Sequence, residues 1–90
     1  MKAIQWGKTF KKDMKRMQKR GKDLEKLAAL VDLLAAGAEL PPKYKDHPLK
    51  GDWQGMRDAH IEPDWLLLYQ AKSDVINLVR TGTHADLFNE

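Results

Sequence analysis

The sequence contains no cysteine among its 90 residues, which excludes disulfide bonds, thiolate catalysis and thiolate-ligated zinc. It also lacks any apolar run near the ~18 residues that a membrane-spanning helix needs. The first six residues lead into lysines rather than into the apolar core of a signal peptide. These absences lead us to expect a cytoplasmic protein without a membrane contact.

Hydrophobic residues make up 42% of the chain and charged residues 32%, which is typical of a soluble globular protein. A chain of this length predicts a single domain over residues 1–90. Basic charge is concentrated at the start, because residues 1–22 hold nine Lys or Arg and one Asp. Such a segment suits a polyanionic partner or forms a solvated helix face, and composition alone leaves both open.

Residues 1–37 predict a short strand followed by two amphipathic helices. Residues 2–6 alternate weakly as in a strand. Phe10, Met14 and Met17 mark one face of a helix over residues 9–20, and Gly21 ends it. Leucines and a valine at helical spacing predict a second helix over residues 22–36, ended by Gly37. The two helices are expected to form an αα-hairpin with their apolar faces in the core.

The second half predicts a connector followed by an antiparallel sheet. Residues 40–48 contain three prolines and are expected to be extended rather than helical. From Trp53 the apolar pattern changes to period two, with Met56, Asp58 and His60 on one side of a strand. Residues 65–70 predict a central strand and residues 75–81 a last one, with Ile76, Leu78 and Arg80 sharing a face. The expected fold is α+β, with the N-terminal strand and the αα-hairpin packed on a small, mainly antiparallel sheet.

Three histidines, several aspartates and an arginine lie in two short stretches, residues 46–65 and 80–88. These groups can serve as base, acid and phosphate-stabilising cation in RNA cleavage by attack of the ribose 2′-OH. Read alone, each histidine is more often a surface or capping residue than a catalytic one, and Arg80 can pair with Asp58 or Asp64. No two histidines have the i, i+4 spacing of a helical metal site, so we expect no metal and no cofactor.

The aromatic residues of the same stretches have two readings each. Trp53 and Trp65 lie in or beside predicted strands, which favours core or rim packing over base stacking. Phe88 lies beyond the last strand, in a short tail where a large ring either stacks on a base or caps the sheet edge.

Three blocks of sequence carry a resemblance to a known family: residues 44–49 (YKDHPL), 57–65 (RDAHIEPDW) and 80–88 (RTGTHADLF). Together with the gaps between them, they resemble the signature of YafQ-type toxins of the RelE/ParE superfamily of bacterial toxin–antitoxin modules. The resemblance extends over nearly the whole chain, including the two-helix opening.

The resemblance implies a ribosome-dependent mRNA endonuclease that cuts the codon in the ribosomal A site and is inhibited by an antitoxin. Its catalytic residues would be His47, His60, Asp64 and His84 for proton transfer, with Arg80 stabilising the phosphate; we take His84 as the acid. The residues expected to contact or support RNA are Phe88, Trp65, Asp58 and the first-helix lysines Lys8, Lys11, Lys12 and Lys15, the lysines meeting ribosomal RNA.

The partners implied are the 70S ribosome, the mRNA in its A site, and an acidic, DinJ-like antitoxin that is partly disordered when free. Two other readings remain at this stage. One is a non-enzymatic, ParE-like poison that acts by binding its target. The other is a nucleic-acid-binding regulator without catalysis, although no helix has the character of a recognition helix.

Overall fold

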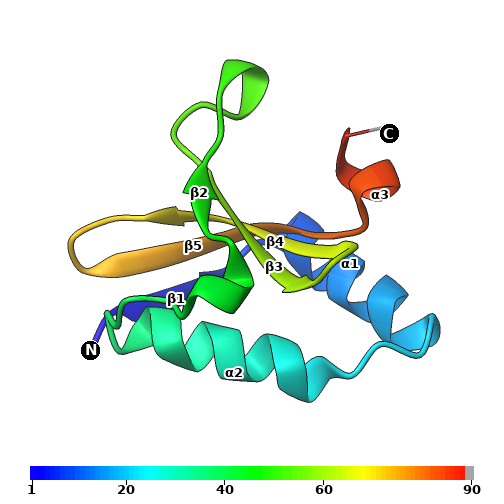
Figure 1. Cartoon of the computed structure of the whole chain (residues 1–90). Coiled ribbons are helices and arrows are strands. Elements are labelled where there is room, and N and C mark those ends of the chain that lie inside the picture. Colours follow the sequence, from blue (N-terminus) through cyan, green and yellow to red (C-terminus); the bar gives the residue numbers. More distant parts are fainter. Residues whose placement is uncertain (89–90) are drawn as a thin grey trace.

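The computed structural model describes residues 1–88, which form a sheet of five strands with helices on both of its sides (Figure 1). The strands are β1 Ala3–Trp6, β2 His47–Pro48, β3 Arg57–Glu62, β4 Trp65–Ala71 and β5 Val75–Gly82. The helices are α1 Lys8–Lys19, α2 Leu24–Ala35 and α3 His84–Phe88, with short 3-10 turns η1 Pro42–Tyr44 and η2 Gly51–Trp53. No helix among these residues is long and apolar enough to cross a membrane.

The strand order is β1-β5-β4-β3-β2. Strands β2, β3, β4 and β5 pair antiparallel with one another in that order. Strand β1 pairs parallel with β5, from Ala3 opposite Val75 to Trp6 opposite Leu78. The mainly antiparallel α+β fold predicted from the sequence is therefore confirmed, including its short first strand. The pairing of β1 with β5 places the first and last strands of the chain side by side.

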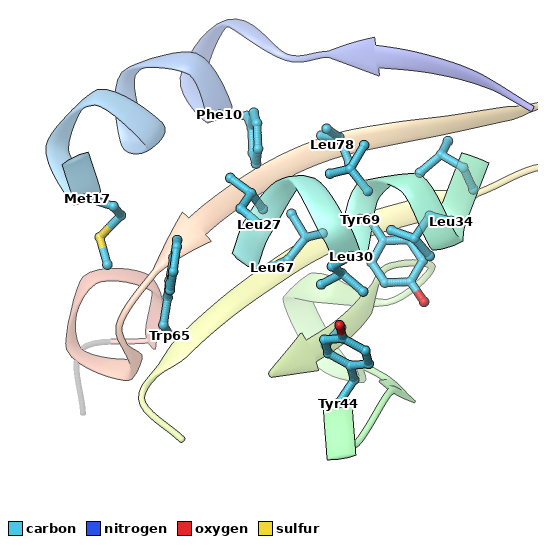
Figure 2. Packing of buried hydrophobic residues seen from close by; sticks show 13 residues of the cluster. Phe10, Met17, Leu27, Leu30, Leu34, Tyr44, Trp65, Leu67, Tyr69 and Leu78 are labelled. Atoms are coloured by element: carbon cyan, nitrogen blue, oxygen red, sulfur yellow. The ribbon is translucent and has the colours of Figure 1, made fainter. Parts of the chain in front are cut away.

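Helices α1 and α2 lie on one side of the sheet and bury the main hydrophobic core against it (Figures 1 and 2). The predicted apolar faces supply this core, because Phe10 and Met17 come from α1 and Leu27 and Leu34 from α2. Strands β3, β4 and β5 supply the other wall, with Trp65 fully buried. The remaining buried members are Leu30, Val31, Tyr44, Ala59, Leu67, Tyr69, Ile76 and Leu78.

The opposite side of the sheet holds a smaller cluster that includes Leu66 and Leu68 of β4 and Leu87 of α3. Leu49, Trp53 and Phe88 pack against it. Strand β4 is thus buried on both faces, as its nearly continuous apolar run predicts. On this side the arm that contains β2 and η2 and the short helix α3 rise from the sheet (Figure 1).

Three details differ from the expectations. The predicted C-terminal tail is helix α3, and two 3-10 turns interrupt the extended connector and the segment around Trp53. The third difference is a bulge in β5, where Leu78 pairs with Tyr69 but Arg80 pairs with Leu68. The bulge adds one residue to β5 between these two pairs and so reverses the alternation of side chains along the strand. Arg80 therefore no longer shares the face of Ile76 and Leu78.

Candidate active site

Three histidines meet on the sheet face opposite α1 and α2. His47 comes from β2, His60 from β3 and His84 from the start of α3. The ring centroids of His47 and His60 are 6.0 Å apart, and those of His60 and His84 are 5.9 Å apart. The row continues to Phe88, whose ring lies 6.4 Å from His84. The structure therefore brings together the three predicted histidines and the predicted aromatic residue of the C-terminal block.

Asp58 lies beneath this row, because His47 pairs with it across β2 and β3. Its carboxylate is only 4% exposed and lies 3.6 Å from Nε2 of His47 and 3.9 Å from Nδ1 of His60. Burial raises the pKa of Asp58, an effect opposed by the nearby histidines. Within residues 1–88, Oδ1 of Asp58 and Nδ1 of His60 have no hydrogen-bond partner, although buried polar atoms are usually paired.

The backbone before His47 is fixed by a group of polar contacts that sequence reasoning missed. Asp46 accepts hydrogen bonds from Arg57 at 3.1 Å and from the hydroxyl of Tyr69 at 2.7 Å. The carbonyl of Lys45, a residue in the left-handed region at φ 48°, accepts a hydrogen bond of 2.8 Å from Nδ1 of His47. A carbonyl can only accept, so Nδ1 carries the hydrogen and Nε2 of His47 faces the site.

His84 is held by Asp64, which lies in the turn between β3 and β4. Asp64 accepts bonds from both the backbone N–H and the ring Nδ1 of His84. Helix α3 itself is fixed by Asp86, which caps its start through Thr83 and accepts two bonds from Arg20 of α1. The Arg20 guanidinium holds the pKa of Asp86 well below its usual range. Both contacts use an ionised carboxylate, Asp64 or Asp86, whose pKa is lowered, so the position of His84 depends on charge.

Arg80 is paired with Asp13 of α1 rather than with Asp58 or Asp64, which corrects the pairing considered from the sequence. The guanidinium donates from Nε at 2.6 Å and from Nη2 at 3.2 Å to the Asp13 carboxylate, which is 1% exposed. Asp13 also accepts the backbone N–H of Thr81. Because of the bulge, Arg80 pairs with Leu68, which in turn pairs with Asp58. Arg80 therefore lies on the same side of the sheet as the histidines.

The other predicted RNA-contacting residues are separated from this row. Trp65 is fully buried in the helix-side core and donates to the Thr81 hydroxyl, which favours a supporting role over direct contact. The four predicted lysines, Lys8, Lys11, Lys12 and Lys15, are exposed, but α1 covers the other side of the sheet. Phe88 instead has a partner that was not predicted for it, since Trp53 meets its ring edge-on at 6.0 Å.

The geometry also fits a transition-metal ion. His47, Asp58 and His60 each offer a ligand atom, and these atoms lie within 4.8 Å of one another. Two imidazole nitrogens and one carboxylate oxygen suit zinc, copper or nickel. The unpartnered Asp58 Oδ1 and His60 Nδ1 support this fit. The helical spacing rule could not reveal the cluster, because β2 and β3 bring its members together.

Comparison with known families places this geometry in context. Residues 2–89 match the family of YafQ toxins, described as bacterial toxins of type II toxin–antitoxin systems. The chain belongs to the YafQ toxin family. The family resemblance seen in the three sequence blocks is therefore confirmed, and the chain is a toxin of a type II toxin–antitoxin system.

Individual relatives agree over nearly the full length. The mRNA interferase toxin YafQ of Escherichia coli K12 is 50% identical over 86 residues, which cover 94% of each chain. In the crystal structure of the E. coli DinJ–YafQ complex, the matching chain is 48% identical with a TM-score of 0.91, covering 98% of this chain and 99% of that one. A metal-bound toxin from Helicobacter pylori is 47% identical with a TM-score of 0.90, covering 98% and 100%.

Proposed function

We propose that this YafQ-family toxin cleaves mRNA in the ribosomal A site by acid/base-assisted attack of the ribose 2′-OH. The observation that carries the proposal is the row of three imidazole rings on one face of the sheet, about 6 Å from ring to ring. That spacing suits a base and an acid on opposite sides of one phosphodiester. The E. coli relative is itself an mRNA interferase, which supports the enzymatic reading over a poison that acts by binding alone.

Each side chain then has a role that follows from its contacts. His84, oriented by Asp64, protonates the departing 5′-oxygen through Nε2. His47 or His60, beside Asp58, takes the proton of the 2′-OH. Arg80 keeps Nη1 outside its bonds to Asp13 and stabilises the charge that develops on the phosphate. Phe88, supported edge-on by Trp53, orients the RNA through a base.

The proposed partners follow from charge and from the relatives. Four exposed lysines of α1, Lys8, Lys11, Lys12 and Lys15, contact ribosomal RNA while the opposite face presents the histidines to the message. The E. coli relative forms a complex with DinJ, and we propose a similar acidic antitoxin for this chain, acting in the cytoplasm.

Primer extension on a defined mRNA in a purified translation system tests this function. We expect cuts inside codons that require ribosomes, that persist in Lys72→Ala and that disappear in His84→Ala. Each proton-transfer group is worth roughly 10²- to 10⁴-fold in rate, so a His84→Ala toxin with undiminished cleavage would rule out the assigned acid. An intact message during growth arrest would favour the binding poison instead.

We also propose that a divalent transition metal binds His47, Asp58 and His60 and inhibits cleavage by occupying the groups that move protons. The buried, unpartnered atoms of Asp58 and His60 support this second proposal, and a similar toxin from H. pylori is metal-bound. Zinc should raise the melting temperature of the wild type but not of His60→Gln. Equal melting shifts in both proteins would disprove the site without reference to activity.

A further inference from the structure

A cleft of about 600 Å³ opens beside the row of histidines. Its walls come from three segments: Lys26 and Ala29 of α2, Lys43 and Lys45 in and after η1, and the outer edge of β3. His60 and His84 line its inner end. We call it the α2–η1 cleft. It lies outside the row of rings that runs from His47 to Phe88, and neither the sequence pattern nor the family resemblance pointed to it.

The cleft lies at a free strand edge. Strand β2 is only two residues long and pairs with Arg57 and Asp58 alone. The rest of β3, as far as Glu62, therefore has no neighbouring strand on that side among the described residues. A free strand edge presents backbone N–H and C=O groups, so this wall offers polar groups to a ligand as well as the side chains of His60 and Ile61.

The charge of the cleft favours an anion. Lys26 is neutralised by Glu62, whose carboxylate lies 2.9 Å from its ammonium nitrogen. Lys43 and Lys45 are exposed, and within residues 1–88 no carboxylate forms an ion pair with either. The Lys43 ammonium lies 5.2 Å from the centre of the Tyr44 ring, which steadies its position at the rim. Two uncompensated cations therefore border a cavity that contains one carboxylate, already paired.

The size and location of the cleft select the kind of anion. Its volume falls within the ~300–1,000 Å³ range of small-ligand sites, which accommodates one nucleotide. An RNA strand whose phosphodiester lies against His60 and His84 must continue on both sides of them. On one side it meets Phe88 and Trp53; on the other it meets the α2–η1 cleft.

We propose that the α2–η1 cleft binds the nucleotide next to the scissile phosphate, with Lys43 and Lys45 contacting its backbone phosphates. This inference rests on the nuclease function proposed above. Tyr44, the only Phe, Tyr or Trp among the described residues that lines the cleft, is buried, so apart from the two histidines at the cleavage site no ring there is open for base stacking. Binding there depends on charge and shape, and base preference is expected to arise elsewhere in the site.

One test fills the cleft without changing any charge. Ala29 lines the cleft, whereas its neighbour Ala28 is exposed outside it. Ala29→Trp should weaken binding of a 2′-O-methyl-blocked RNA tetranucleotide at least tenfold and slow single-turnover cleavage on programmed ribosomes about tenfold. Ala28→Trp, the matched control on the same helix, should change both by less than twofold. Equal behaviour of the two variants would overturn the proposal.

A second test removes charge from the rim, where a folding defect is not expected. Lys43→Ala should weaken binding of the same oligonucleotide several-fold and lower the slope of log affinity against log salt by ~0.7, the contribution of one phosphate contact to a single strand. Lys72→Ala, at the β4–β5 turn, removes the same charge away from the cleft and should leave the slope unchanged. An unchanged slope for Lys43→Ala would contradict the phosphate contact.

The outcomes separate this inference from the function on which it rests. If the wild-type toxin does not cleave mRNA on programmed ribosomes, the nuclease assignment fails whatever the cleft variants do. If the wild type cleaves, His84→Ala does not, and Ala29→Trp and Lys43→Ala match the wild type, only the cleft proposal fails. Loss of antitoxin binding in these variants with RNA binding and cleavage intact would assign the cleft to the antitoxin and overturn the nucleotide site.

Discussion

Asp64 accepts two hydrogen bonds from a single residue, His84, through the backbone N–H at 2.9 Å and the ring Nδ1 at 2.6 Å. The backbone bond is the main cause that lowers the pKa of Asp64, and the ring bond adds to it. An ionised carboxylate can only accept, so the hydrogen of the ring lies on Nδ1. In the proposed mechanism, the nitrogen of His84 that exchanges a proton with RNA is then Nε2.

The first prediction concerns this orientation. Asp64→Asn keeps the shape of the side chain but loses the charge that fixes the ring, so single-turnover cleavage should slow by about 10- to 100-fold, less than the loss of the histidine itself. The pH profile of the remaining activity should also change. Asp74→Asn, at the β4–β5 turn, is the control. A slower rate with an unchanged profile would mean that Asp64 only supports the fold.

The second prediction concerns the ion pair of Asp13 and Arg80. Asp13→Ala leaves the guanidinium and the Thr81 N–H without their acceptor, in a place where Arg80 is only partly exposed. The free energy of unfolding should fall by about 2–4 kcal/mol, near the cost of breaking a buried pair. Urea denaturation measures this directly. Asp32→Ala on the exposed face of α2 should cost less than ~0.5 kcal/mol. Similar losses in the Asp13→Ala and Asp32→Ala variants would contradict a stabilising role for the Asp13–Arg80 ion pair.

The third prediction follows from the buried charge of Asp58. Because burial raises its pKa, the native state binds the proton more tightly than the unfolded chain does. Stability is therefore lost as the pH rises from the ordinary pKa of an aspartate to the raised one. Asp58→Asn removes this cost and at pH 8 should raise stability by about 1 kcal/mol, or roughly 4–8 °C in melting temperature.

At pH 5.5 the gain from Asp58→Asn should be smaller, since a falling pH approaches the raised pKa of Asp58 and protonation begins to remove the buried charge in the wild type. Thermal melts of the wild type and the variant at the two pH values measure the difference. A larger gain at pH 5.5 than at pH 8 would contradict a raised pKa of Asp58.

The fourth prediction separates packing from RNA contact at Trp65. Its indole donates to the Thr81 hydroxyl at 2.9 Å, and that hydroxyl donates to the carbonyl of Leu66. Trp65→Phe should cost about 1–3 kcal/mol in stability through the lost bond and the cavity but leave affinity for the blocked RNA unchanged. Trp6→Phe, at an exposed tryptophan, should barely affect stability. Weaker RNA binding by the folded Trp65→Phe variant would support the direct contact with RNA that the sequence led us to expect of Trp65.

The spacing of apolar residues predicted the helices and strands well, because this spacing follows from which face of each element is buried. The helical stripes of α1 and α2 and the apolar run of β4 each reflect a face that must leave water. Period two also placed Asp58 and His60 on one side of their strand. His47 could not be placed in this way, because a two-residue strand next to a proline has no pattern of its own.

Other contacts were invisible because the residue types have an ordinary explanation. Asp13 stands among lysines on an amphipathic helix, where an acidic residue usually faces solvent, and only the packing of α1 on β5 reveals it as the partner of Arg80. Helix α3 did leave a signal. Thr83 and Asp86 have the spacing of a reciprocal cap, and a side chain at Gly82 would meet Asp86 at 2.9 Å.

The parallel pairing of β1 with β5 also bears on how the toxin is made. Residues 3–6 are translated long before their sheet partners, residues 75–78. The sheet therefore cannot close, and His84 cannot take its place, until residues 75–84 have been synthesised. We expect a chain that ends before β5 to lack the assembled row of histidines and therefore to be inactive.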